Sequence, residues 1–368
     1  MLAVSKQERK AKISQLEKEL NAKVICFVTS DRPGVDPVAN SITRDCIKII
    51  ERHLDAGEHP DVIALYLVSH GGDVDVPWPL VSLLRSHCKK LCAVVPYICH
   101  SAATLVALGC DELVVGPRAQ LSPTDPTLQV KTGTDENSPV LRFGVEDVNA
   151  FVEFVKKTLG SRFSSYGHEG LAKLIDRVQP EALGSINRMY SRTRLIIEKM
   201  LRLTKRNYTK KEMERLVSLL TVAYYAHTHF ISRQEMEDEL RLPITRAEKL
   251  KVDGLIWDLY EEYATELQSR QLFEMQAELH RSHQNPVTVE VKAKFVESAK
   301  RTDMFTQTMV LQGTTIPNFN FTIPQIPGLQ DQSVLQQVVQ HFLGELNAQL
   351  KPFLVAKRLS SFGEWKNE

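Results

Sequence analysis

The turn 69–72, Ser69-His70-Gly71-Gly72, has residue types that could bind a reacting carbonyl oxygen. It directly follows the apolar run 62–68. Two adjacent glycines allow backbone conformations that a Cβ atom would forbid, so an amide N–H can point at a developing oxyanion. The same two residues also suit an ordinary tight turn, and this motif alone does not decide between the two interpretations.

Ser101 is the second residue with chemical potential, because it follows the apolar run 91–98 and opens a helical pattern. A serine at this junction could be a nucleophile, since the helix dipole and the amide of Ala102 would stabilise negative charge in acyl transfer. The small residues Ala102 and Ala103 would let a substrate backbone come close. Helix capping is the alternative role for a serine in this position.

The elements that must position these turns alternate between short apolar runs and amphipathic stretches. Uninterrupted apolar strands separated by helices predict a parallel sheet covered on both faces, and ligands of such sheets lie at the carboxyl ends of the strands. Both turns come at such ends. The predicted strands are 24–28, 62–68, 91–98 and 113–115, and the predicted helices are 36–54, 78–88 and 102–110.

After Pro126 the sequence pattern changes from short apolar runs to long helical patterns. Apolar residues at three-four spacing predict a helical lobe with helices at 145–159, 171–178, 186–203 and 211–226. Ser232 with Glu235 predicts the start of another helix. Alternating runs at 286–296 and 305–311 predict a β-hairpin, followed by a Pro-rich link and a final helix at 333–350. We therefore expect an amphipathic helix at 1–22, an α/β domain at 23–140, the helical lobe at 141–275 and the hairpin with its helix at 285–368.

Composition excludes several classes of protein. The chain of 368 residues is 43% hydrophobic and 25% charged, which predicts a globular protein with a core of ordinary size. It has 46 basic and 45 acidic residues, so it lacks the excess of positive charge expected of a dedicated nucleic-acid binder. The six cysteines lie in or beside apolar runs and are expected to be core thiols in a reducing compartment, with no metal or cofactor. No membrane span or signal peptide is recognisable, so a cytoplasmic location is expected.

Together the two turns resemble the Clp/crotonase superfamily, in the branch of signal peptide peptidase A. The nearest likeness is to the serine dehydrogenase proteinase family. Three segments carry this resemblance: Ser-Ala-Ala-Thr-Leu-Val-Ala-Leu at 101–108, Asp-Glu-Leu-Val at 111–114 and Ser-Pro-Thr-Asp-Pro at 122–126. It covers about 24–128 and implies a Clp/crotonase-like fold with repeated βαβ units, working as a homo-oligomer.

The resemblance implies a serine peptidase in which Ser101 is the nucleophile and the amides of Gly72 and Ala102 form the oxyanion hole. An extended segment after Gly72 would pair with a bound peptide as an added strand. The sequence departs from the family at the general base. The Clp-type histidine is replaced within 123–126, and acidic residues stand where the lysine of signal peptide peptidase A would fall, which leaves Lys131 as the nearest candidate.

Four residues are expected to line the cleft: Gly71, His70, His100 and Asp125. His100 could also be the base, and Asp125 could orient a base or cap a turn. Two other functions remain open at this point. One is a non-catalytic relative that keeps the peptide groove but has lost its base. The other is a crotonase-type enzyme that holds a thioester enolate with the same two amides, although no acid pair for that chemistry is present.

Overall fold

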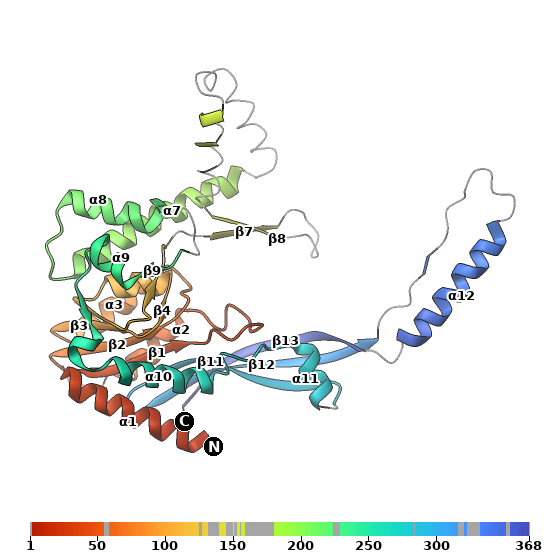
Figure 1. Ribbon diagram of the computed structural model, residues 1–368, viewed down its shortest axis with the longest axis horizontal. Helices are drawn as coiled ribbons and strands as arrows, with labels where there is room; N and C mark the ends of the chain where they lie inside the picture. Colours follow the sequence, from red (N-terminus) through yellow and green to blue (C-terminus); the bar gives the residue numbers. More distant parts are fainter. Residues whose placement is uncertain are drawn as a thin grey trace.

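The structure is a computed structural model, shown in Figure 1. It describes residues 2–54, 59–124, 127–131, 140–144, 150, 153–154, 156–158, 180–223, 229–282, 284–315, 320–321, 332–350 and 354–367. The predicted helix 171–178 lies outside these residues, and 145–159 lies inside them only in part.

An eight-stranded mixed sheet forms the centre of an α/β fold, with strand order β10-β5-β3-β2-β1-β11-β12-β13. The first five strands in this order are parallel to one another, and the last three are antiparallel. The parallel strands are β1 (Lys23–Thr29), β2 (Val62–Val68), β3 (Lys90–Val95), β5 (Glu112–Val115) and β10 (Ile244–Arg246). The parallel sheet predicted from the apolar runs is therefore present, and it is extended at one edge by antiparallel strands.

Both faces of the sheet are apolar, as a parallel sheet covered by helices requires. In β1, Val24 and Cys26 point to one face, while Ile25 and Phe27 point to the other. The first face packs on α1 (Leu2–Leu20) and α10 (Asp253–Glu266). The second packs on α2 (Asp45–Glu51), α3 (Pro77–Ser86), α4 (Ala102–Leu108) and α7 (Pro180–Leu203).

The six cysteines are unpaired thiols, and five of them are buried. Burial raises the pKa of the Cys92 thiol to about 12, with the Glu112 carboxylate adding to the shift. Such thiols behave as small apolar side chains. The expectation of core thiols is confirmed for these five, and Cys88 is half-buried.

One predicted strand is wrong in its extent. The run 91–98 is divided, because β3 ends at Val95 and a separate strand β4 (Ile98–Cys99) begins after Pro96 and Tyr97. Proline has no N–H to donate to a sheet, so Pro96 ends the pairing of β3. The strand β4 instead pairs with β6 (Gln120–Leu121), which pairs with β9 (Ile231–Ser232) in a small second sheet.

The helices after the sheet begin where capping residues allow. The predicted start at Ser232 is confirmed, because the Ser232 Oγ accepts from the Glu235 N–H at 3.3 Å and the Glu235 carboxylate accepts from the Ser232 N–H at 2.7 Å. This helix is α9 (Arg233–Asp238). Thr209 caps α8 in the same way, and the structure then continues as a π-helical turn. The bounds are α8 (Lys210–Ser218) and η2 (Leu219–Ala223).

The C-terminal hairpin predicted from alternation is present as two long strands that join the main sheet. These are β11 (Val287–Glu297) and β12 (Thr302–Thr315), and β11 pairs antiparallel with β1. The last strand β13 (Leu354–Asn367) follows β12 at the sheet edge. Before it comes α12 (Gln332–Leu350), which Figure 1 shows apart from the sheet and its helices.

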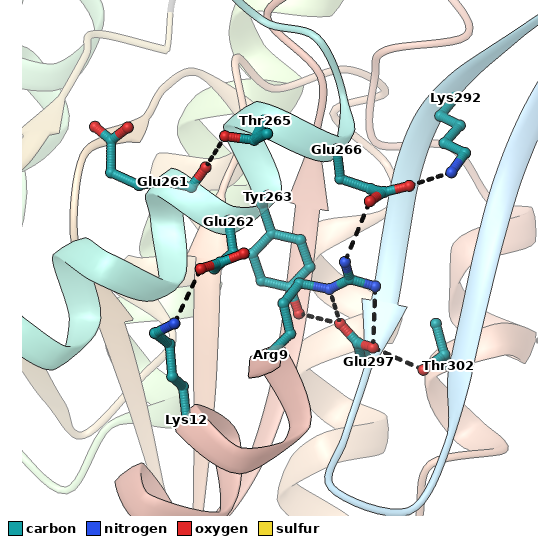
Figure 2. Close-up of polar contacts among 10 residues, drawn as sticks. All are labelled: Arg9, Lys12, Glu261, Glu262, Tyr263, Thr265, Glu266, Lys292, Glu297 and Thr302. Carbon is teal, nitrogen blue, oxygen red and sulfur yellow. Dashed lines mark hydrogen bonds and ion pairs between the residues drawn. The ribbon is translucent and has the colours of Figure 1, made fainter. Parts of the chain in front are cut away.

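A buried ionic cluster fastens α1 to α10 and to the hairpin β11–β12 (Figure 2). The Arg9 side chain is 1% exposed, and its Nε donates to the Glu297 carboxylate at 2.8 Å. Tyr263 and Thr302 each donate a hydroxyl hydrogen bond to Glu297 at 2.7 Å. Glu266 faces Arg9 from the other side, with 3.6 Å between the guanidinium and the carboxylate. Side chains of α1, α10 and β12 therefore meet at Glu297 of β11.

His53 forms a second buried polar contact with the same hairpin. Its Nδ1 lies 3.0 Å from the Ser298 Oγ, and its Nε2 lies 3.0 Å from the Asp303 carboxylate. Burial lowers the pKa of His53 to about 4, and the nearby Asp303 opposes that shift only in part. The imidazole is therefore neutral in the folded protein at neutral pH.

We expect acid to destabilise the fold through His53. Its pKa is lower in the folded chain than in the unfolded one, so the unfolded state binds more protons between about pH 6.5 and about pH 4. The stabilisation is complete above that range and is lost as the pH falls through it, by roughly 2–3 kcal/mol at most. Urea unfolding across this range measures the loss. A His53→Gln variant should show a flatter pH profile, and an unchanged profile would contradict the assignment to His53.

Candidate active site

The two turns singled out in the sequence lie side by side at the carboxyl end of the sheet. Ser69, just after β2, forms an isolated parallel bridge with Cys99 of β4. The Ser69 N–H donates to the Ile98 carbonyl at 2.9 Å, and the His100 N–H donates to the Ser69 carbonyl at 2.8 Å. These two bonds bring the diglycine turn next to Ser101.

Gly71 touches the Ser101 turn so closely that no other residue type fits. A Cβ on Gly71 would lie 2.7 Å from the Ser101 Cβ and 2.9 Å from the Ala102 nitrogen. Gly71 also has a φ of +103°, which L side chains rarely adopt. Gly72 must also be glycine, because a Cβ added to it would lie 2.4 Å from the Ile42 carbonyl oxygen. Both glycines are therefore required by close backbone approach, which goes beyond what a simple turn needs.

Ser101 has a strained backbone and does not cap the helix that it precedes. Its φ is +51° and its ψ is −117°, and its side chain forms no cap hydrogen bond with α4. A non-glycine residue with positive φ costs free energy and is typical of functional turns. The side chain is half-buried, so it is not sealed in the core. The structure therefore does not support the capping interpretation.

Ser122 and Thr104 hold the Ser101 turn in place, and sequence reasoning assigned neither of them a role. The Ser122 Oγ accepts from the Ser101 N–H at 2.8 Å and donates to the Pro123 carbonyl at 2.9 Å. The Thr104 hydroxyl lies 2.8 Å from the Cys99 carbonyl and 3.1 Å from the Ser122 carbonyl. Both belong to the segments that carry the family resemblance, which is the signal that could have identified them.

Replacing Ser122 by alanine should loosen this turn. The Ser101 N–H would lose its acceptor, and an unsatisfied donor of this kind costs about 1–3 kcal/mol. Urea unfolding should show that loss, and the Ser101 hydroxyl should react more slowly with a fluorophosphonate. The matched control is Ser86→Ala at an exposed serine, expected to change stability by less than about 0.5 kcal/mol. Equal behaviour of the two variants would show that Ser122 does not support the turn.

The backbone amides of Gly72 and Ala102 belong to the two turns that meet at Ser101. Neither the Gly72 N–H nor the Ala102 N–H donates to any residue in the described part of the chain. Gly72 is exposed, while Ala102 begins α4, where the first amides of a helix have no partner within the helix. These are the two amides that the family resemblance implies for an oxyanion hole.

The expectation of an extended segment after Gly72 is wrong beyond Asp73. The Asp73 carboxylate accepts from the Asp75 N–H at 2.9 Å, and its carbonyl accepts from the Val76 N–H at 3.1 Å. These bonds turn the chain directly into α3, which begins at Pro77. An aspartate that binds its own downstream backbone competes with strand formation, which explains the difference.

His70 and His100 form an edge-to-face ring pair, with centroids 5.6 Å apart. Desolvation lowers the pKa of His70, against a smaller opposing effect of Asp31. Neither ring hydrogen-bonds to Ser101: within the described residues, no side chain bonds to its hydroxyl. The two histidines therefore neighbour the candidate nucleophile without activating it in this conformation.

The sequence-predicted base lies on a separate hairpin. Lys131 ends β7 (Thr127–Lys131), which pairs with β8 (Val140–Gly144), and Lys131 stands opposite Val140. Figure 1 shows this hairpin projecting from the main body. The structure describes the backbone of Lys131 but not its side chain, and Asp125 lies outside the described residues. The general base therefore stays a prediction.

Searches for other kinds of site give two findings. No group of three or more potential metal-ligating side chains occurs within the described ranges. None of the helices traced there combines the length and the apolar character that crossing a bilayer demands.

Comparisons with known proteins give matches among solved structures only. No protein-family model and no curated protein matches the chain. A serine-to-alanine mutant of the 1510-N membrane-bound stomatin-specific protease aligns with 32% of this chain and 58% of its own, at 19% identity and a TM-score of 0.23. A lysine-to-alanine mutant of that protease with a substrate peptide aligns with 32% and 54%, at 20% identity and a TM-score of 0.23. The chain thus matches little more than half the length of these proteases.

Proposed function

We propose that this protein is a serine hydrolase, and specifically a peptidase that works through an acyl-enzyme on Ser101. The observation that carries the proposal is the contact between Gly71 and Ser101. It brings a hydroxyl on a strained turn close to the amides of Gly72 and Ala102, which donate to no residue in the described part of the chain. Acyl transfer needs a nucleophile and paired donors directed at the same carbonyl group.

In the proposed reaction the Ser101 hydroxyl attacks the carbonyl carbon of a peptide bond. The carbonyl oxygen becomes negative and is bound by the N–H groups of Gly72 and Ala102. The hydroxyl proton passes to a base and then to the departing amine, after which water hydrolyses the ester on Ser101. The base that we propose is Lys131, whose amine would need to be buried to be neutral at neutral pH.

A fluorophosphonate probe tests this proposal on the full-length protein. It should form one adduct, mapped by peptide mass spectrometry to Ser101 and absent from Ser101→Ala. A Lys131→Arg variant keeps the charge but cannot readily lose its proton, so the adduct should form more slowly. The control is Lys156→Arg, at a lysine that pairs with Glu153 on the surface. A protein that is folded by circular dichroism yet never labelled would overturn the hydrolase proposal.

One observation favours a second candidate, a non-catalytic peptide-binding subunit. The Ser101 hydroxyl has no hydrogen-bonded base among the described residues. In that case fluorescein-labelled casein would bind without being cleaved, and Ser101→Ala would bind it equally well. Anisotropy and gel electrophoresis of the same samples separate the two candidates.

The setting of either function is also a proposal. The expected ligand is a peptide or protein, the expected assembly is a homo-oligomer and the expected location is the cytoplasm. Mass photometry of the purified chain tests the assembly.

A further inference from the structure

Lys294 is a buried lysine without a carboxylate partner. It lies on β11 opposite Thr29 of β1 and is only 1% exposed. Its Nζ donates to the Thr43 hydroxyl at 2.7 Å and lies 4.5 Å from the centre of the Phe305 ring. Among the described residues, no carboxylate is within ion-pair distance of it. Fully buried lysines are rare unless they are paired, so this one needs an explanation.

A pocket of about 660 Å³ opens beside Lys294. Phe305 forms part of its wall, and its ring packs against Gly363 of β13. A Cβ on Gly363 would lie 2.1 Å from this ring. The glycine therefore makes room for an aromatic surface next to the amine.

Gln307 adds an independent sign of a missing ligand in the same pocket. Its side-chain nitrogen donates to the Ser361 hydroxyl at 2.9 Å. Its Oε1 is buried and has no partner within the described part of the chain, and the residue is 5% exposed. An unsatisfied buried acceptor costs about 1–3 kcal/mol, so a ligand with an O–H or N–H group would be favoured here.

A hydroxyl and a carboxylate lie close to the amine. The Thr43 hydroxyl accepts from Lys294 and lies 3.6 Å from the Cys46 Sγ, and the neighbouring Asp45 carboxylate accepts from the Trp365 indole N–H. Although burial opposes the shift, hydrogen bonding lowers the pKa of Asp45, so it is ionised and can accept a proton. Burial lowers the pKa of the Lys294 amine, while Cys46 and Asp45 oppose that shift. Desolvated lysines of this kind supply the neutral amines of covalent catalysis.

We propose that Lys294 is a nucleophilic amine that forms an imine with a small hydroxyaldehyde bound in this pocket. The Nζ lone pair attacks the aldehyde carbon, a C=N bond replaces the C=O bond, and the oxygen leaves as water. The neutral Nζ amine gives up both of its protons, one after the other; the Asp45 carboxylate accepts each and returns it to the departing oxygen, which leaves as water. The hydroxyl group of the ligand donates to the Gln307 Oε1.

Reductive trapping with glycolaldehyde and cyanoborohydride tests the proposal in the full-length protein. Reduction turns an imine into a stable hydroxyethyl amine, which peptide mass spectrometry locates. Near neutral pH, Lys294 should be modified severalfold faster than Lys210, because a lowered pKa leaves a larger fraction of the amine neutral. Lys210 is a suitable comparator within the same sample because its side chain is 92% exposed.

Variants and denaturation separate the parts of this proposal. Lys294→Arg should remove the adduct at this position, and Asp45→Asn should slow it without changing the modification of Lys210. The preference for Lys294 should disappear in urea. Modification of Lys294 no faster than Lys210 in the folded protein would overturn the proposal, and an unaffected Asp45→Asn variant would overturn the proton transfer to Asp45. None of these readouts depends on Ser101.

Discussion

Replacing Gly71 by alanine is expected to reduce the rate at which Ser101 reacts with a fluorophosphonate by at least about 100-fold. The new Cβ would be placed 2.7 Å from the Ser101 Cβ and 2.8 Å from the His100 carbonyl oxygen, so one of the two turns must move. The alanine would also hold a φ of +103°, which is unfavourable for an L residue. Displacement of either turn separates the hydroxyl from the amide of Gly72.

Gly254→Ala is the matched control for this prediction. Gly254 lies in α10, and beyond its chain neighbours and its own helix backbone no heavy atom of the described residues lies within 4 Å of the position that a Cβ would take. Alanine is the better helix former by about 1 kcal/mol, so this variant should be at least as stable as the parent and should be labelled at the parent rate. A Gly71→Ala protein that is folded and labelled as fast as Gly254→Ala would show that the two turns do not act together.

The sheet could be predicted from the sequence because its strands are continuous apolar runs. The run 62–68 matches β2 residue for residue, since every side chain there is buried except that of Val62. The strand predicted at 91–98 was too long. Its hydrophobic pattern continues through Pro96, although the proline ends the pairing of β3 with its neighbours. Alternation at 286–296 predicted a strand, but it carries no information on the partner. The pairing of Lys294 with Thr29 joins strands far apart in the sequence, so a local pattern could not predict it.

The candidate site was predictable to the extent that it depends on local geometry. Glycine pairs and a serine before a helix indicate turns directly. The two turns meet because Ser69, which follows β2, forms a bridge with Cys99 of β4. The support from Ser122 could not be derived, because it is a backbone-to-side-chain bond between residues 21 positions apart. The general base stays a prediction, and its candidate Lys131 belongs to a hairpin outside the main sheet.

Glu297→Ala should be the most destabilising substitution in the buried ionic cluster of Figure 2. Glu297 is 0% exposed and accepts hydrogen bonds from Arg9, Tyr263 and Thr302. Its removal leaves the Arg9 guanidinium buried without its main partner, and a broken buried pair costs about 3–5 kcal/mol. Urea unfolding of the full-length chain should show this loss, with α1 released first in hydrogen exchange.

The paired variant distinguishes an uncompensated charge from lost packing. If the cost comes from the unpaired Arg9, then Arg9→Met combined with Glu297→Leu should recover most of the stability, because two apolar side chains leave no buried charge. Glu278→Ala is the control, since Glu278 pairs with an Arg281 side chain that is 70% exposed, and it should cost less than about 1 kcal/mol. A double variant as unstable as Glu297→Ala alone would instead assign the loss to the hydroxyl partners Tyr263 and Thr302. The attachment of α1 would then depend on apolar packing of Ile13 and Leu16, which are fully buried against the sheet.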